Sequence, residues 1–252
     1  MVNTPHISIV VPNRTYQAIA RSEIKRIANT VGFTSNRLAE IEIIVAEMTS
    51  NLVKHTTAGG EILVKSIAGD NPGMELICID GGPGMESVFK MMEDGVSSTN
   101  TMGQGLGAIR RLSDDFDIYS LKDWGTILVS RIYINTPAIQ KKRPAEVRVL
   151  MVSKEGESVC GDNYHFNINK ANQLKFILSD GLGHGKQAAI AADESIASFL
   201  SNPLLPPNEQ IKKIHAAIKS TRGAVINISY LDFTNKQIMY CGVGNISSNI
   251  FS

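Results

Sequence analysis

The stretch Glu47-Met-Thr-Ser-Asn51-Leu-Val-Lys54-His55 decides the fold of the first half of the chain. Glu47, Asn51 and His55 are four residues apart, so they share one face of a helix. An apolar stripe on the other face predicts a helix that starts near Ser35 or Asn36, either of which is a good N-cap, and that ends near His55. The stripe consists of Leu38, Ile41, Ile44, Val45, Met48 and Leu52. The helix is expected to pack this stripe on a core and to present a carboxylate, a carboxamide and an imidazole on its other side.

The elements around this helix predict a layer of helices on a sheet. Residues 8–11 form a short apolar run, and residues 15–31 predict an amphipathic helix that Gly32 would end. The stripe of that earlier helix consists of Tyr16, Ile19, Ala20, Ile24, Ile27 and Val31. The elements expected further along the first half are strands at 61–68, 74–80 and 126–134 and a short helix at 106–112. Helices on one side of an antiparallel or mixed sheet give an α+β layer.

Two glycine-rich stretches follow these strands. Residues 80–85 read Asp-Gly-Gly-Pro-Gly-Met, and residues 103–107 read Gly-Gln-Gly-Leu-Gly at the start of the short helix. Each piece has a plain alternative, because polar helix faces are often only solvated and Asp-Gly-Gly-Pro-Gly forms tight turns. Residues 103–108 also satisfy a relaxed dinucleotide fingerprint, but the preceding residues 97–102 are polar and do not predict the apolar strand which that motif needs.

The order of these pieces resembles the nucleotide-binding fold shared by gyrase, Hsp90, histidine kinases and MutL, the GHKL superfamily. The short length and the lack of a dimerisation helix resemble the bacterial anti-sigma-factor serine kinases, especially the RsbT-type switch kinases. The resemblance covers about residues 5–134.

The resemblance implies roles for individual side chains. Asn51 would give an oxygen to Mg²⁺ beside the phosphates of ATP, and Glu47 would take the proton from an attacking serine hydroxyl. Asp80 would accept a hydrogen bond from the adenine amino group. The other residues of the implied nucleotide site are Gly82, Gly84, Gly103, Gly105, Leu106, Gly107 and Thr126, together with Lys54 and His55, for which a phosphate role and a structural role are both open. In that set, glycines 82 and 84 would leave room for the base, glycines 103, 105 and 107 would form a lid over the phosphates, and Thr126 would add a hydroxyl near Asp80.

The second half of the chain predicts a second layered sheet. Its expected elements are strands at 147–153, 158–166, 174–180, 225–233 and 237–242 and helices at 186–200 and 208–221. Residues 137–146 contain two prolines and a basic cluster without periodicity, which predicts a linker. The sign of the net charge also changes at this point. Residues 1–136 contain 12 basic and 15 acidic residues, whereas residues 137–252 contain 13 basic and 9 acidic residues.

Two aspartates in the second half predict a metal site. Asp162 lies in Cys-Gly-Asp-Asn at 160–163, and Asp180 lies in Ser-Asp-Gly-Leu-Gly-His-Gly-Lys at 179–186, after an apolar run. An aspartate at a strand end, with glycines beyond it, can direct a carboxylate and a backbone carbonyl at one cation.

Together these motifs resemble the SpoIIE- and RsbX-type serine/threonine phosphatases of the metal-dependent (PPM) group, from about residue 147 onward. The resemblance includes the late segments 224–232 and 237–245, with Gly-Val-Gly-Asn at 242–245. It implies that Asp162 bridges two Mn²⁺ or Mg²⁺ ions, that Asp180 and the Gly181 carbonyl bind one of them, and that a metal-bound water attacks phosphorus. His184 is either a hydrogen-bond donor to the groups that bind the metal or, as we expect, a structural residue of the loop.

The chain departs from this family in one respect. Such phosphatases supply further metal-binding aspartates downstream, whereas the sequence stops at Ser252. Asp232 is no substitute, because its position before a hairpin turn predicts that it shapes that turn. The 252 residues are therefore either a piece of a longer protein or a protein with a degenerate phosphatase half, and the phosphatase activity is in question.

Composition sets several function classes aside. The net charge is +1, which predicts no nucleic-acid surface, and no apolar run approaches the ~18 residues of a membrane span. The N-terminus lacks the features of a signal peptide, and three cysteines without CxxC spacing favour the cytoplasm.

The sequence as a whole predicts an α+β chain of two domains. A GHKL-type ATP-binding α/β sandwich at 1–136 and a PPM-phosphatase-like layered β/α domain at 147–252 flank the linker. The predicted function is a bacterial partner-switching regulator that binds Mg·ATP, phosphorylates a serine on a STAS-domain anti-anti-sigma protein or another sigma-regulatory protein, and carries a metal-dependent serine phosphatase-like domain. The alternatives are a non-catalytic ATP-dependent switch with a degenerate phosphatase scaffold and, last, a dinucleotide oxidoreductase. A homodimer is left open.

Overall fold

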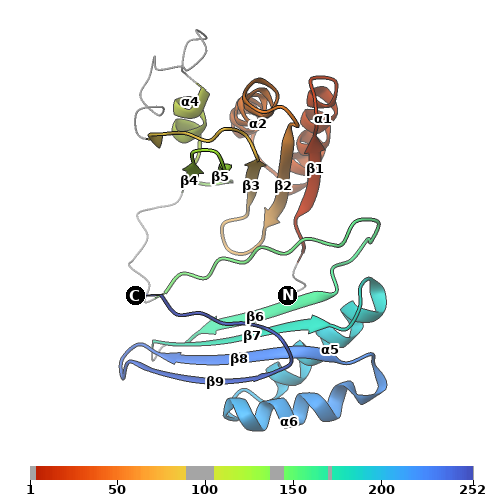
Figure 1. Ribbon diagram of the computed structural model, residues 1–252. Helices are drawn as coiled ribbons and strands as arrows, with labels where there is room; N and C mark the ends of the chain where they lie inside the picture. The colour runs from red at the N-terminus through yellow and green to blue at the C-terminus, as the bar shows by residue number, and fades with distance from the viewer. Residues whose placement is uncertain (1–3, 89–104, 137–144, 170–171, 252) are drawn as a thin grey trace. The chain divides into compact units, whose positions relative to one another are not determined.

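The computed structural model describes residues 4–88, 105–136, 145–169 and 172–251, and it is a mixed α/β structure with two sheets (Figure 1). The described residues from 6 to 136 form one compact unit, and those from 145 onward belong to a second. Most of the predicted linker, residues 137–144, lies outside the described residues, so its boundaries stay a prediction. Among the described helices, none is long and apolar enough to cross a membrane.

The first unit is a five-stranded antiparallel sheet with helices on one face. Its elements are β1 (Ile7–Val11), α1 (Tyr16–Val31), α2 (Ser35–His55), β2 (Gly60–Ile67), β3 (Gly73–Asp80), α4 (Gly105–Leu112), β4 (Asp115–Leu121) and β5 (Gly125–Tyr133). The strand order is β1-β2-β3-β5-β4. The predicted strands and helices of this half are therefore confirmed, within one or two residues at their ends, and the sheet is antiparallel.

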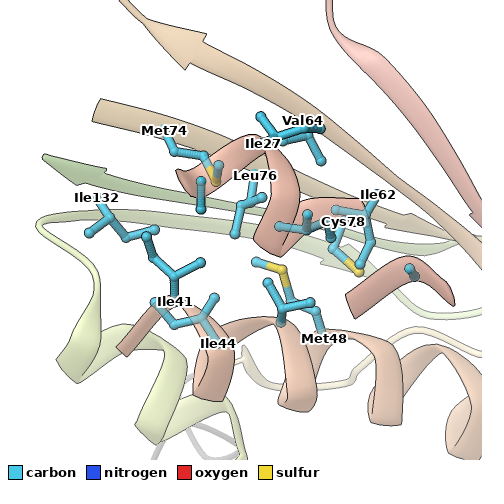
Figure 2. Close-up of a cluster of buried hydrophobic side chains, with 14 of the residues drawn as sticks. Ile27, Ile41, Ile44, Met48, Ile62, Val64, Met74, Leu76, Cys78 and Ile132 are labelled. Atoms are coloured by element: carbon cyan, nitrogen blue, oxygen red, sulfur yellow. The ribbon is translucent and has the colours of Figure 1, made fainter. Parts of the chain in front are cut away.

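The core of the first unit lies between the helices and the sheet, as Figure 2 shows. Ile41, Ile44 and Met48 of α2 meet Leu76 and Cys78 of β3 there. The predicted stripe of α2 is thus confirmed as the face that packs on the sheet. That packing directs the opposite, polar face of the helix away from the core.

Three details of the first half differ from the sequence expectation. Tyr16 and Ile19 of α1 are exposed, at 43% and 59% of their surface, because the buried face is centred on the later residues from Ala20 to Ala28. The N-cap of α2 is Thr34, whose hydroxyl accepts a hydrogen bond from Arg37 N at 3.4 Å, rather than residue 35 or 36. Strand β4 was not predicted at all, because its alternating aspartates mask an edge strand that is only partly buried.

The second unit is a four-stranded antiparallel sheet in the order β6-β7-β8-β9. Its elements are β6 (Asp162–Ile168), β7 (Gln173–Gly181), α5 (Lys186–Ser201), α6 (Pro207–Ala217), the 3₁₀ turn η1 (Ile218–Ser220), β8 (Ala224–Asp232) and β9 (Gln237–Val243). Residues of α5 and α6 share a core with β7 and β8, so both helices cover one face of this sheet (Figure 1).

Two predicted strands of the second half need correction. Residues 147–153 form no strand beyond an isolated bridge, and the predicted strand at 158–166 begins only at Asp162. Their alternating apolar residues serve packing instead of a ladder, because Val149, Met151 and Cys160 cluster with Tyr164 of β6. The last helix is also shorter than expected, since α6 ends at Ala217 and η1 follows.

The hairpin turn after β8 confirms the role predicted for Asp232. Its carboxylate accepts hydrogen bonds from Thr234 N at 3.0 Å and from Asn235 N at 2.8 Å, and it also bonds the Gln173 side chain. These bonds lower the pKa of Asp232 to about 2, with the Asn235 backbone bond as the largest cause. Asp232 is therefore occupied with shaping the turn.

Candidate functional site

The polar face of α2 meets the start of α4. A Cβ atom placed on Gly105 would lie 2.8 Å from Glu47 Oε2 and 3.8 Å from Asn51 Oδ1. Glu47 and Asn51 are both half-buried, one helical turn apart. The structure therefore brings the predicted base, the predicted Mg²⁺ ligand and one predicted lid glycine together, and a side chain at residue 105 would have to displace the Glu47 carboxylate.

Asp80 lies at the end of β3, on the face of the sheet that the helices cover. Its neighbour two residues back, Cys78, belongs to the core, and side chains two apart in a strand share a face. Asp80 pairs with Thr126 of β5 in the ladder, so the two side chains lie next to each other. The Thr126 hydroxyl is also within 2.9 Å of Ser120 Oγ. The predicted proximity of the Thr126 hydroxyl to Asp80 thus agrees with the register.

The carboxylate of Asp80 also orders the loop that follows it. Gly82 N donates a hydrogen bond to Asp80 Oδ1 at 2.8 Å, and a Cβ on Gly82 would lie 3.0 Å from the His55 carbonyl oxygen. The loop therefore touches the C-terminal end of α2. Burial lowers the pKa of His55, as does the neighbouring Lys54 charge, while Asp80 opposes the shift. His55 is consequently a neutral imidazole at pH 7, whereas Lys54 is exposed.

Gly84 has a structural requirement of its own. Its φ is +66°, and a Cβ there would lie 2.0 Å from the Leu121 carbonyl oxygen of β4. Asp123 N donates to the Pro83 carbonyl at 2.8 Å, so the loop is held on the β4–β5 hairpin. Only glycine allows this close approach. Contact between this loop and a nucleotide base stays a prediction.

The other residues of the predicted lid are Gly103, Leu106 and Gly107. Gly107 is buried in α4, and Leu106 packs partly buried against the core of the first unit. Gly103 lies outside the described residues. The side chain of Leu106 is thus directed at least in part to packing.

In the second unit, Asp162 and Asp180 are direct partners in the β6–β7 ladder. Their side chains therefore lie on the same face of the sheet, next to each other. Partial burial raises the pKa of Asp162, and the neighbouring Asp180 charge raises it further. Two carboxylates that repel each other in this way form a donor set that a divalent cation would stabilise.

The backbone at the end of β7 is packed closely against β6 and α5. Gly181 N donates to the Gly161 carbonyl at 3.1 Å, and a Cβ on Gly181 would lie 2.1 Å from the Ala188 carbonyl oxygen. No group of three or more His, Cys, Asp or Glu side chains suited to a metal occurs in the described part of the chain. The two aspartates fit one Mg²⁺ whose other ligands are waters, and the donors for a pair of ions are not gathered here.

The sheet register brings a third segment to this corner. Asp180 pairs with Val225 of β8, and a Cβ on Gly244 would lie 2.4 Å from Val225 Cγ1. The glycine-rich segment 242–245 therefore ends beside the strand that neighbours Asp180. Segments that are about 80 residues apart in the sequence thus meet at one end of the sheet.

Sequence reasoning missed two charged residues at this corner. Glu157 Oε1 lies 2.6 Å from His184 Nδ1, which agrees with the structural role predicted for His184, and the same carboxylate lies against Gly185. Arg222 Nη1 would lie 3.2 Å from a Cβ on Gly183. The available signal was the Arg-Gly pair at 222–223, a charged residue and a glycine next to an apolar strand, as in Asp-Gly at 180–181.

Comparisons with known proteins agree with both halves in outline. Residues 11–132 match the model of the histidine kinase-like ATPase domain. Serine/threonine-protein kinase RsbT of Bacillus subtilis is 32% identical over 108 residues, which are 42% of this chain and 80% of that kinase. Phosphoserine phosphatase RsbX of Bacillus subtilis is 27% identical over 111 residues, which are 43% of this chain and 54% of that phosphatase.

A solved structure of RsbX in complex with magnesium is similar at 29% identity with a TM-score of 0.36, over 38% of this chain and 47% of that one. The chain thus spans about half the length of the phosphatase that it matches.

Proposed function

Because this chain belongs to the histidine kinase-like ATPase domain family, we propose that its first unit binds ATP with Mg²⁺. The proposed reaction is transfer of the γ-phosphoryl group to a serine hydroxyl. The proposed acceptor is a STAS-domain anti-anti-sigma protein or another sigma-regulatory protein in the bacterial cytoplasm. The similarity to the serine/threonine kinase RsbT supports this reaction class.

The contact between α2 and α4 carries this proposal. Glu47 Oε2 and Asn51 Oδ1 both lie near Gly105, so a carboxylate, a carboxamide oxygen and the N-terminus of a helix meet at one place. Helix N-termini favour phosphate groups, and Mg²⁺ favours carboxamide and carboxylate oxygens together with water. The three groups together suit a triphosphate with its cation.

Each of these residues has a separate role in the proposed reaction. Asn51 would hold Mg²⁺ at the phosphates, while Glu47, one turn away, would accept the proton of the attacking serine. Asp80 lies about 7 Å along β3 from the core residue Cys78. Its carboxylate would accept a hydrogen bond from the adenine amino group. The Mg²⁺ ion itself would neutralise charge on the transferred phosphoryl group.

A matched pair of α2 variants tests the kinase proposal. Glu47→Gln keeps the shape of the side chain but removes the base, so phosphoryl transfer to a STAS-domain protein is expected to fall about 100-fold or more. ATP affinity, measured by calorimetry, is expected to stay within about twofold. Glu42→Gln makes the same change on an exposed site of α2, where the carboxylate pairs with Lys25, and should alter neither quantity.

The outcome of that test separates the kinase from the binding switch. A protein that controls its partner through ATP occupancy alone would keep partner binding and release unchanged in Glu47→Gln. No phosphoryl transfer by the wild-type protein to any STAS-domain protein, with ATP bound normally, would reject the kinase and leave the switch.

For the second unit we propose a metal-dependent serine phosphatase-like role. The adjacent carboxylates of Asp162 and Asp180 support it, as does the similarity to the phosphoserine phosphatase RsbX. The bound Mg²⁺ or Mn²⁺ would activate a water for attack on a phosphoserine. Asp162 and Asp180 would hold the ion, with the Gly181 carbonyl as a third oxygen. Loss of phosphate from a phosphorylated STAS-domain protein, in the presence of Mn²⁺ and absent in Asp180→Asn, is the measurement that checks this role.

A further inference from the structure

Arg222 lies beside the glycine-rich loop that follows Asp180. Leu182 N donates a hydrogen bond to the Gly223 carbonyl at 3.0 Å, which holds the loop next to the start of β8. Arg222 Nη1 lies so close to the loop that a Cβ on Gly183 would be 3.2 Å from it. The guanidinium is therefore placed against the backbone of the loop, at the end of the sheet where the two aspartates pair.

The charge of Arg222 has no partner in the described part of the chain. Arg37 pairs with Asp114, and Arg131 pairs with Glu75 and Asp115. Arg222 is exposed, and it forms no ion pair or hydrogen bond with any residue that the structure describes. Its five N–H donors thus have no hydrogen-bond partner among the described residues.

The proposed reaction needs a cation at this place. The two positive charges of a divalent ion are formally matched by the carboxylates of Asp162 and Asp180, so the charge of an approaching phosphomonoester dianion has no counter-charge from that set. A guanidinium can bind two phosphate oxygens in a bidentate manner and keeps its charge at every relevant pH. Gly183, with φ of +92° and no side chain, leaves the guanidinium room beside the loop.

We propose that Arg222 is a substrate-binding residue that takes the phosphate group of a phosphoserine as it is presented to the metal held by Asp162 and Asp180. This inference rests on the phosphatase-like role proposed for the second unit. It assigns Arg222 to binding of the phosphate, while the metal ligands hold the attacking water.

Two binding measurements on the full chain test it. The first is the affinity for Mn²⁺ alone, followed by electron paramagnetic resonance. The second is the affinity for inorganic phosphate, followed by ³¹P NMR with and without saturating Mg²⁺. The variants are Arg222→Ala, Arg222→Lys and Asp180→Asn, with Lys219→Ala as a control that removes an exposed positive charge from η1.

The expected pattern is specific to a phosphate contact. Arg222→Ala should weaken phosphate binding about tenfold or more and leave Mn²⁺ affinity within about twofold, because only the bidentate charge-assisted bonds are lost. Arg222→Lys should fall between, since an ammonium keeps the charge but not the fork. Lys219→Ala should bind phosphate like the wild-type protein.

The two proposals fail in different ways. Equal phosphate binding by Arg222→Ala and the wild-type protein, or no phosphate binding by the wild-type protein, overturns the assignment of Arg222. Absence of Mn²⁺ binding by the wild-type protein overturns the metal site. If the phosphate affinity then still depends on Arg222, the phosphate contact is supported and the metal site is not.

Discussion

Gly105, the first residue of α4, lies directly against Glu47 of α2, with space between them for a hydrogen but not for a methyl group. Gly105→Ala is therefore expected to displace the Glu47 carboxylate, the flexible group nearest to the new Cβ. Phosphoryl transfer should fall about tenfold or more, because misplacement of a catalytic group by about 1 Å has effects of this size. Thermal unfolding checks the fold, and a variant of normal stability and normal transfer rate would contradict the proposed role of Glu47.

Asp80→Asn tests the nucleotide end of the first site. The variant keeps an oxygen that can accept the Gly82 N–H bond, so the loop should remain in place. Affinity for ATP is expected to fall about tenfold, because a charge-assisted bond to the adenine amino group becomes a neutral one. Affinity for GTP, which lacks that amino group at the same ring position, should change little. Calorimetric titration with both nucleotides distinguishes this result from a general loss of binding.

Glu75→Gln tests an ion network within the first unit. Glu75 accepts a hydrogen bond from His6 Nε2 at 2.8 Å and pairs with Arg131. Burial by itself would raise the pKa of Glu75, but the His6 bond and the Arg131 charge lower it below its ordinary value. Removal of the charge is expected to cost about 3 kcal/mol of unfolding free energy at pH 7.

The pH dependence of that cost follows from the lowered pKa. The stability from the Glu75 carboxylate is fully present above the pKa of an unfolded Glu, about 4.3, and is lost as the pH falls through the lower folded value. Denaturant unfolding between pH 7 and pH 3 should therefore show the gap between wild type and Glu75→Gln closing only below about pH 4. A gap that is constant over the whole range would contradict this assignment.

Asp162→Asn is expected to raise the stability of the metal-free protein. The raised pKa of Asp162 means that its ionised form destabilises the fold, a cost that is fully present above the folded pKa and is gone once the pH falls below the pKa of an unfolded Asp, about 3.9. At neutral pH the variant should gain about 2 °C in Tm, which Glu155→Gln, a change of an exposed carboxylate, should not. In thermal unfolding, added Mn²⁺ should raise the Tm of the wild-type protein and leave the Tm of Asp162→Asn unchanged.

The sequence predicted the elements whose side chains repeat with a clear period. The stripe from Ile41 to Leu52 identified α2, and the apolar runs identified β2, β3, β5, β7 and β8, because burial of one face or both leaves that pattern. Strand β4 was not predicted, since an edge strand with two aspartates does not show this apolar pattern. Residues 147–153 were mistaken for a strand, because Val149 and Met151 pack on β6 in alternation without joining a ladder.

The candidate sites could be predicted only as sets of residues. The spacing of Glu47, Asn51 and His55 gave their common helix face, but the approach of Gly105 depends on how α4 packs on α2. The pairing of Asp162 with Asp180 likewise depends on strand register, which neither aspartate's own sequence motif shows. The Arg-Gly pair at 222–223 marks Arg222 only as a residue next to a strand, because its position beside Gly183 comes from a contact across two loops.

The pairing of Asp162 with Asp180 is decided far from either residue. At the other end of the β6–β7 hairpin, Asn169 N donates to the Gln173 carbonyl at 3.0 Å, and Gln173 N donates to Asn169 Oδ1 at 3.0 Å. A slip of one residue there would turn every side chain of one strand to the opposite side, and one aspartate with it. An insertion or deletion at this distant bend would thus separate the two carboxylates while both remained in the sequence.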